Sequence, residues 1–252
     1  MTDRKSAKHL IIGGGIIGCS IAYHLAKSGE TDIVLLERAN LTEGATWHAA
    51  GLVGQLRSSR NTTRMLKKSV EMYDKLQNEE GFQFDWKKTG SLRLASSNER
   101  LLEAKRLATM ARSFDLEMLI ISPQEAKELF PLIEENGLHG AAFIPSDGYV
   151  DPSALCSAIA NAARKYGAQI NQNIAVLDFI TNDRRIKEVK TSNCVYEVEN
   201  VILAAGMWSR ELGAKLGIKV PTCAVEHQYI ITEPTGIAVS YTHLTLPTIL
   251  LV

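Results

Sequence analysis

The feature that most constrains this chain is a glycine-rich turn between a short apolar run and a helical segment. Gly13, Gly15 and Gly18 form a G-x-G-x-x-G pattern directly after the apolar run 9–12. The first glycine permits a tight turn, the second lets the backbone approach a pyrophosphate, and the third lets helix and strand pack closely. The helix predicted after the turn stops at Gly29, and its N-terminus would face the phosphates.

A second apolar run, "DIVLLE", follows this helix and predicts a buried parallel strand that ends at Glu37. Glu37 lies 19 residues after Gly18. An acid at this distance is placed to accept hydrogen bonds from a ribose. The segment therefore predicts a β-α-β unit that binds a dinucleotide, and these residues leave NAD and FAD both open. Arg38 is interpreted either as a surface residue or as a contact to the adenosine.

Further helices and strands are expected along the rest of the chain. Ser122 and Glu125 form a capping box around Pro123, and Asp151 precedes Pro152 as a second helix start. We expect helices at 62–78, 98–114, 122–130 and 151–167, and strands at 89–95, 169–180 and 200–206.

This order predicts an α/β fold, a doubly wound dinucleotide-binding domain interrupted by a smaller α+β domain. The predicted boundaries are 1–80 with 150–220 for the binding domain, and 81–149 with 221–237 for part of a substrate domain. Residues 238–252 contain no Asp, Glu, Lys or Arg, and "SYTHLTLPT" resembles translated adapter read-through. We therefore interpret 238–252 as a non-native tail.

Composition excludes several classes of partner. Lys and Arg number 28, Asp and Glu also number 28, so we expect neither nucleic acid nor an anionic membrane as partner. The four cysteines form no C-x-x-C pair, which favours buried thiols over disulfides or a metal site. We see no apolar run of the roughly 20 residues that a membrane helix needs, and no signal or transit peptide, so we expect a cytoplasmic protein.

The stretch "EGATWHAAG", residues 43–51, is not explained by a nicotinamide-binding fold. Small residues directly after the second strand would let a flat, bulky group lie against the backbone. Five other stretches occur with it in a fixed order: "IIGGGIIGCSIAYHLAKSG", "TGSLRLA", "SDGYVDPSAL", "VILAAGMWSREL" and "VEHQYIIT". In this order and spacing the chain resembles the dimethylglycine and sarcosine dehydrogenases over residues 8–236. These are FAD enzymes of the D-amino-acid-oxidase-like superfamily.

The resemblance implies a set of FAD-binding residues. They are Gly13, Gly15, Ile16, Ile17 and Gly18 at the pyrophosphate turn; Glu37 and Arg38 at the adenosine; Gly44, Ala45, Thr46, Trp47, His48, Ala49, Ala50, Gly51 and Leu52 along pyrophosphate and flavin; Val176 at the adenine; and Gly206 and Trp208 near the cofactor. In that family the histidine corresponding to His48 carries FAD covalently through the 8α-methyl carbon. A neutral imidazole is a competent nucleophile near pH 7.

The reaction implied by the resemblance is oxidation of an N-methyl amino acid, sarcosine or dimethylglycine. Hydride leaves the methyl carbon for the flavin, and water hydrolyses the iminium to formaldehyde and the demethylated amine. The resemblance implies an electron-transfer flavoprotein as acceptor, and tetrahydrofolate only through a C-terminal domain beyond this chain. His227 and Tyr229, two apart on a predicted strand, are candidates for the substrate side. We expect the 252-residue chain alone to be inactive and poorly loaded with flavin.

Three alternatives remain from the sequence. The first is an amino-acid or amine oxidase with non-covalent FAD, in which the position of His48 need not be histidine. The second is a non-catalytic regulatory subunit of the same fold. The third is an NAD dehydrogenase, which the absorbance of the bound cofactor would exclude. The choice between sarcosine and dimethylglycine also stays open.

Overall fold

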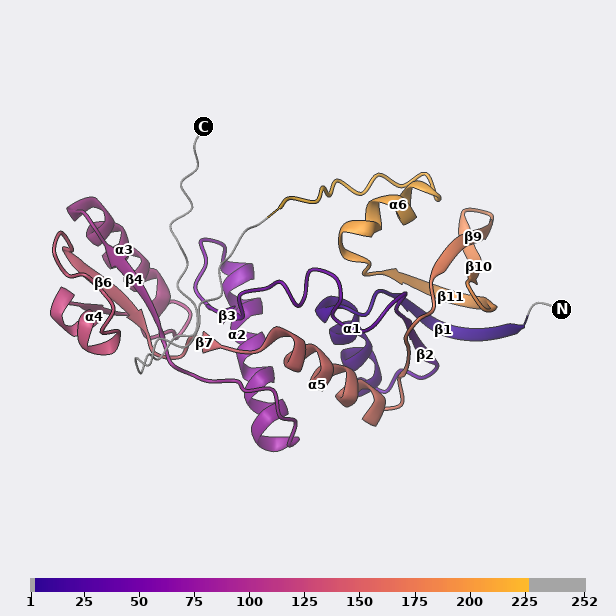
Figure 1. Ribbon diagram of the computed structural model, residues 1–252, viewed down its shortest axis with the longest axis horizontal. Coiled ribbons are helices and arrows are strands. Elements are labelled where there is room, and N and C mark those ends of the chain that lie inside the picture. The colour runs from indigo at the N-terminus through magenta and orange to yellow at the C-terminus, as the bar shows by residue number, and fades with distance from the viewer. Residues whose placement is uncertain (1–2, 227–252) are drawn as a thin grey trace. The chain divides into compact units, whose positions relative to one another are not determined.

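The computed structural model describes residues 3–226, which form two compact units (Figure 1). Within that part, the first unit comprises 3–49, Gly81–Phe84 and Asp151–Glu226, and the second comprises Ala50–Glu80 and Asp85–Val150. The chain therefore leaves the first unit near Ala49, whereas the sequence placed 50–80 in the binding domain. The interpretation of 238–252 as a non-native tail lies outside the described residues.

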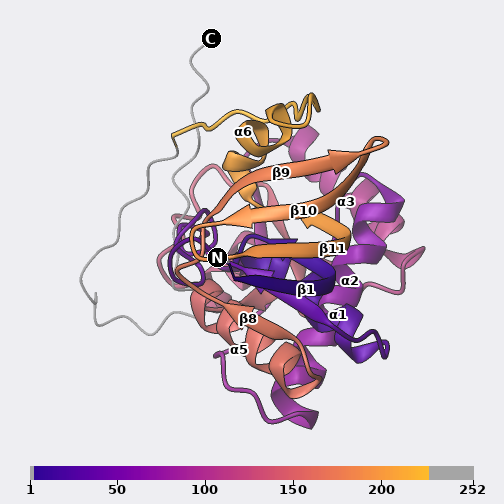
Figure 2. The same ribbon diagram turned by 90° about the vertical axis from the view of Figure 1, so that its right-hand side faces the viewer.

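The first unit is built around a six-stranded sheet of order β8-β2-β1-β11-β10-β9 (Figure 2). β8, β2, β1 and β11 run parallel, and β10 and β9 continue the sheet antiparallel. Its elements are β1 (Arg4–Ile12), α1 (Ile16–Lys27), β2 (Ile33–Leu36), α5 (Pro152–Lys165), β8 (Gln169–Asn171), β9 (Val176–Asn182), β10 (Arg185–Thr191), β11 (Val195–Leu203), the 3-10 turn η2 (Gly206–Trp208) and α6 (Ser209–Ala214).

The two faces of this sheet bury different residues. Helix α1 packs on β1, β2 and α5. On the opposite face, Leu10, Val34 and Leu36 share a buried cluster with Val189 of β10 and Tyr196 of β11. The predicted α/β fold is thus confirmed, and β10 and β9 extend the parallel part of the sheet antiparallel beyond β11.

The β9–β10 connection explains the antiparallel extension of the sheet. Asp183 and Arg184 both have positive φ, 49° and 61°, the pattern of a two-residue type I′ hairpin. A turn this short keeps β10 beside β9 and leaves no residues for a crossover helix. The segment 169–180, expected as one strand, contains β8 and the start of β9. The strands are separate because Asn173 N and Ile174 N donate to Ala39 O and Glu37 O instead of pairing within the sheet.

Helix α5 begins and ends as the sequence predicts. The Asp151 carboxylate accepts from the backbone N–H groups of Ser153 and Ala154, and Pro152 occupies the first helical position. Gly167, with φ of +98°, follows the helix in the left-handed region. Cys19, Cys156 and Cys194 are buried as expected, whereas Cys223 is exposed, so the prediction of a buried thiol is wrong there.

The second unit combines helices with two small antiparallel sheets, one of order β4-β6-β5 and one formed by β3 and β7. Leu56 joins the buried cluster of Ala104, Ala108, Ala142 and Ile144. The predicted capping box of Ser122 and Glu125 is present at α4. The elements are β3 (Leu52–Val53), α2 (Arg60–Asp74), the π-helical turn η1 (Lys75–Glu79), β4 (Ser91–Ala95), α3 (Asn98–Arg112), β5 (Leu119–Ile121), α4 (Pro123–Leu129), β6 (Gly140–Ile144) and β7 (Gly148–Tyr149).

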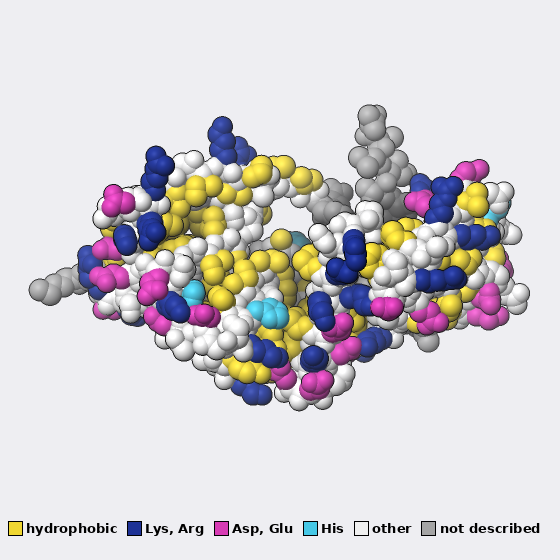
Figure 3. All heavy atoms as spheres, turned by 180° about the vertical axis from the view of Figure 1, so that it is seen from behind, with side chains coloured by type: hydrophobic (Ala, Val, Ile, Leu, Met, Phe, Trp, Pro, Cys, Tyr) yellow, Lys and Arg dark blue, Asp and Glu magenta, His cyan; other side chains and the backbone are white. Residues whose placement is uncertain are grey.

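Charged side chains of both signs are interspersed over the visible surface (Figure 3), in keeping with the formal net charge of zero. Among residues 3–226, no helix is long and apolar enough to cross a membrane.

Candidate cofactor site

The glycine turn joins the C-terminal end of β1 to the N-terminus of α1. Gly13 has φ of +116°, and a Cβ there would lie 2.4 Å from the carbonyl oxygen of Ala204. A Cβ on Gly18 would lie 1.9 Å from Gly13 O. Neither position accepts a side chain, because backbone atoms occupy the space. The first and third glycines of the pattern are therefore required by packing alone.

The N-terminus of α1 is left open to an anion. Gly15 is the N-cap and has no side chain to accept a hydrogen bond, and the first turn contains no acid. Thr46 Oγ1 accepts from Ile16 N over 3.1 Å, which fixes the following loop against this end of the helix. Ile17 is exposed. Apart from that of Ile16, the N–H groups of the first turn and the positive end of the helix dipole fit a pyrophosphate.

Glu37 is tied to the backbone around it. One carboxylate oxygen accepts from Gly14 N over 2.7 Å, and the other accepts from Ala39 N over 2.9 Å. Each oxygen of an ionised carboxylate has two lone pairs, so a ribose hydroxyl could still donate to Glu37. Gly14 is a residue that the pattern missed: a Cβ there would lie 2.8 Å from Glu37 Cβ. The signal in the sequence was the run of three consecutive glycines, Gly13 to Gly15, of which the pattern uses only the first and the last.

Arg38, Gly44 and Trp208 come together beside this acid. The Arg38 guanidinium carbon lies 3.9 Å from the centroid of the Trp208 ring, a cation–π contact. A Cβ on Gly44 would be 3.4 Å from Trp208 Cζ3. Gly206 has φ of +54° and open space where a Cβ would lie, so its conformation, rather than crowding, favours glycine there.

His48 ends a turn of small residues after β2. Its Nδ1 lies 3.1 Å from Gly44 O, and its ring centroid is 3.8 Å from that of Trp47. A carbonyl oxygen only accepts, so this contact requires the proton on Nδ1 and leaves the lone pair on Nε2 in the neutral ring. Both rings are exposed, and so are Ala45 and Ala49.

The other predicted residues are not all gathered here. Val176 is half-buried at the start of β9 and packs against the core cluster of the first unit. Ala50, Gly51 and Leu52 belong to the second unit, where Leu52 pairs with Tyr149. His227 and Tyr229, the predicted catalytic pair, lie outside the described residues.

Two buried thiols, which sequence reasoning did not connect to the site, support the glycine turn. The Sγ atoms of Cys19 and Cys156 lie 3.7 and 3.8 Å from Gly14 O. The hydrogen bond with Cys156, together with burial, raises the pKa of the Cys19 thiol. Cys19 is therefore protonated at neutral pH and acts as a packing group. Its place on α1, directly after Gly18, was the signal for this contact.

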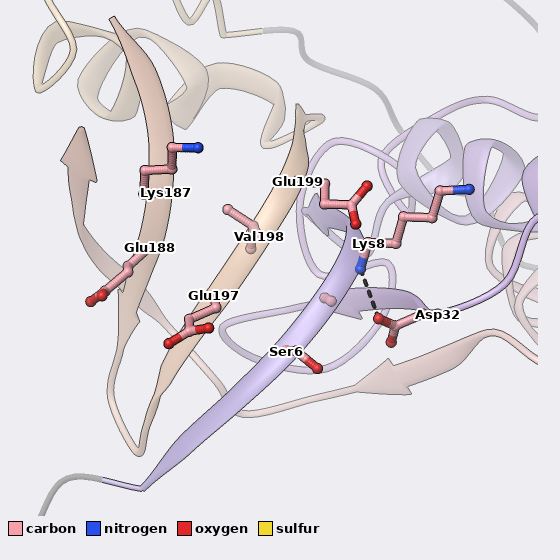
Figure 4. Close-up of a pocket in the computed structure, with 9 residues that line it drawn as sticks. Ser6, Lys8, Asp32, Lys187, Glu188, Glu197, Val198 and Glu199 are labelled. Atoms are coloured by element: carbon pink, nitrogen blue, oxygen red, sulfur yellow. Dashed lines mark hydrogen bonds between the residues drawn. The ribbon is translucent and has the colours of Figure 1, made fainter. Parts of the chain in front are cut away.

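A separate hollow of about 490 Å³ lies elsewhere in the first unit (Figure 4). Its lining includes Ser6, Lys8, Lys187 and Glu199, and Lys8 N donates to Asp32 Oδ2 over 2.9 Å. Ser6 and Lys8 lie in the first half of β1, whereas the glycine turn follows its end. Ligands of parallel α/β sheets bind beyond the C-terminal ends of strands. This hollow is therefore not the dinucleotide site.

A β-α-β turn with an open helix N-terminus and an acid at the next strand end defines a dinucleotide-binding unit. The model of the FAD-dependent oxidoreductase family matches residues 8–249, and the chain belongs to that family. Among residues 3–226, no group of three or more His, Cys, Asp or Glu could hold a metal ion.

The curated relatives include amine dehydrogenases. The chain is 38% identical to mitochondrial sarcosine dehydrogenase of Mus musculus over 91% of its own length and 26% of that protein's. It is 38% identical to mitochondrial dimethylglycine dehydrogenase of Rattus norvegicus over 91% of its length and 27% of that protein's. The chain thus spans about a quarter of the length of these relatives.

Two further comparisons show that the chain is also similar to a protein with another substrate and to a regulatory subunit. The crystal structure of L-proline dehydrogenase from P. horikoshii matches with a TM-score of 0.81 and 32% identity, covering 86% of this chain and 57% of that one. The mitochondrial pyruvate dehydrogenase phosphatase regulatory subunit of Mus musculus is 36% identical over 90% of this chain and 26% of its own length.

Proposed function

We propose that this chain is the FAD-binding part of a dehydrogenase that oxidatively demethylates an N-methyl amino acid, sarcosine or dimethylglycine. The observation that carries the proposal is His48, an exposed imidazole on a turn of small residues beside the dinucleotide site, with its Nδ1 at Gly44 O. The likeness to sarcosine and dimethylglycine dehydrogenases supports the choice of substrate.

The residues of the first unit fit FAD. The open N-terminus of α1 would hold the pyrophosphate, and Glu37 would accept from the ribose. Arg38 stacked on Trp208 would offer a flat cationic surface to the adenosine side. Bound FAD would supply an acceptor for the hydride that leaves the carbon next to the amine nitrogen.

His48 is proposed to carry the flavin through a covalent bond. Because Gly44 O holds the proton on Nδ1, the nucleophilic lone pair is on Nε2, which makes Nε2 the expected point of attachment. The hydrogen bond to Gly44 O also orients the imidazole ring of His48, so it sets the direction in which the bond from Nε2 to the flavin would form. The proposed electron acceptor is an electron-transfer flavoprotein, and tetrahydrofolate would need a domain beyond this chain.

A peptide mass map after incubation with FAD tests the tether. Trypsin releases Ala39–Arg57, which contains His48. In a protein that joins this chain to the further length its relatives have, addition of a flavin to this peptide, and its loss in H48A, is the expected result. H24A, on helix α1, is the matched control and should leave the adduct unchanged. A yellow protein with an unmodified peptide would favour a non-covalent amino-acid or amine oxidase instead.

A regulatory subunit is the second candidate, because one relative carries that name at 36% identity. It predicts a colourless protein in which the peptide is unmodified and FAD does not bind. Sarcosine and dimethylglycine oxidation, assayed with an artificial electron-accepting dye in a protein that joins this chain to the further length its relatives have, separates the two. Turnover by the 252-residue chain alone would contradict our expectation that it is inactive.

A further inference from the structure

One residue at the start of the turn that carries His48 has a strained backbone. Thr42 has φ of 73°, in the left-handed region. Within residues 3–226, seven non-glycine residues have positive φ, and five of them are Asp or Asn, which tolerate this region. Thr42 is the one β-branched residue among these seven. A left-handed conformation brings its Cβ close to the following carbonyl oxygen, so it persists only where the surrounding structure holds it.

The backbone of Thr42 joins the glycine turn to the turn that carries His48. The N–H of Thr42 donates to Gly14 O over 3.2 Å, and its carbonyl oxygen accepts from Trp47 N over 3.3 Å. The N–H of Gly14 donates in turn to the Glu37 carboxylate over 2.7 Å. Gly14 is therefore held at both its N–H and its carbonyl oxygen, and the segment leading to His48 starts from this fixed point.

The side chain of Thr42 and the residue before it are also held. Leu41 N donates to Gln172 Oε1 over 2.7 Å. The Thr42 hydroxyl lies 3.5 Å from Oγ of Ser153, in the first turn of α5. Because a β-branched side chain has few accessible rotamers, this contact with α5 also restricts the backbone torsions of residue 42.

The torsions of Thr42 set the course of the chain toward His48. With its N–H fixed on Gly14 O, a rotation to the ordinary φ of about −60° would turn its carbonyl oxygen away from Trp47 N. The contact of His48 Nδ1 with Gly44 O lies inside the turn that this hydrogen bond closes and next to it. The orientation of the imidazole therefore depends on the conformation of Thr42.

We propose that Thr42 is a positioning residue, which holds the turn 43–48 against the glycine turn and so fixes the place and orientation of the His48 imidazole. The use of that imidazole for flavin attachment rests on the proposed function; the strained residue and its contacts do not. Glycine at position 42 would adopt the same torsions without strain, and many others as well. Threonine thus selects one arrangement of the turn at a cost in stability.

Nitrogen-15 NMR of the imidazole rings in the chain tests the proposal without any flavin. In mildly alkaline buffer the ring is neutral, and the spectrum reports which nitrogen carries the proton. T42G removes both strain and fixation, T42S keeps the hydroxyl, and H48Q assigns the resonances. D115G, which relieves a positive φ of 53° in the second unit, is the matched control. Urea denaturation followed by circular dichroism gives the stability of each variant.

In the wild-type chain, T42S and D115G we expect the proton on Nδ1 of His48. In T42G we expect a mixture of both tautomers and a urea midpoint no lower than that of the wild type. Release of the strain should outweigh the greater freedom of glycine in the unfolded chain. T42G with the proton wholly on Nδ1, a lowered midpoint in T42G, or a T42S that behaves like T42G would each overturn the proposal.

Mass mapping of the peptide Ala39–Arg57 separates this proposal from the proposed function, in a protein that joins this chain to the further length its relatives have. Flavin attachment in T42G should be about tenfold slower than in the wild type, because the nucleophile is less well oriented. Equal rates in the two would contradict positioning by Thr42. Absence of the adduct from the wild type, with the tautomers differing as expected, would contradict the proposed function and support the orienting role of Thr42.

Discussion

Substitution of Gly18 by alanine sets two known effects against each other. In the interior of an exposed helix this change stabilises by about 1 kcal/mol, because glycine is the poorer helix former. At Gly18 the new Cβ would lie 1.9 Å from Gly13 O, about 1.5 Å short of the 3.4 Å at which ordinary contact begins. Gly13 O is a backbone atom that follows the end of β1, so it cannot move away by a side-chain rotation.

The steric effect should dominate. Inserting a group into a packed site costs about 1–3 kcal/mol, and this clash is severe enough for the upper part of that range. After subtracting the helix-propensity gain, we expect G18A to lower the free energy of unfolding by about 2 kcal/mol. Because α1 must move away from Gly13, its N-terminus also leaves the place proposed for the pyrophosphate.

Urea denaturation followed by circular dichroism measures the first effect, and quenching of FAD fluorescence measures the second. S20A, two residues further along the same helix, is the matched control and should be neutral or slightly stabilising. G18A with wild-type stability and wild-type FAD affinity would refute the reasoning, because the close approach at Gly13 O would then have no energetic consequence.

Three other substitutions test separate parts of the chain. H48A should change the free energy of unfolding by less than about 0.5 kcal/mol in urea, because its ring is exposed. D147N should lower it by about 1 kcal/mol, since the amide oxygen can still accept from Gln55 N but the new N–H₂ group faces Ser91 Oγ, whose hydroxyl must reverse from donor to acceptor inside a fully buried site. Hydrogen bonds from Lys8 and His9 hold the pKa of the Glu30 carboxyl below its ordinary value of 4.5. Its contribution to stability is therefore present above that value and lost as the pH falls through the lowered pKa, and E30Q should flatten this acid limb in unfolding measured against pH.

The elements set by local chemistry could be predicted from the sequence. The Asp151 cap, the Ser122 capping box and the glycine turn each depend on residues a few positions apart, so their geometry is visible in the order of side chains. The two strands within 169–180 were expected as one, because the break depends on hydrogen bonds from Asn173 and Ile174 to residues of another strand end. Pairing at that sequence distance leaves no local pattern.

The same reason explains which tertiary contacts escaped prediction. Arg57 and Arg93 meet through Leu56 O, and Asp147 joins Gln55 to Ser91 across strands far apart in the chain. A buried carboxylate surrounded by neutral donors has no characteristic spacing in sequence. The resemblance to a family indicates which motifs follow one another along the chain. It does not indicate which side chains of different motifs contact one another in the folded protein.

Glu37 shows why the dinucleotide motif alone does not establish catalysis. Its carboxylate joins Gly14 N to Ala39 N, so this acid organises the turn before any ligand binds. The glycines at 13 and 18 are likewise required by backbone contacts within the protein. A regulatory relative could therefore keep the whole motif for folding.

His48 is different: its ring is exposed and contacts Gly44 O and Trp47 at the surface, so packing gives little reason for histidine there. The reactivity of His48 toward FAD is accordingly the property that separates a dehydrogenase from a regulatory protein of the same fold.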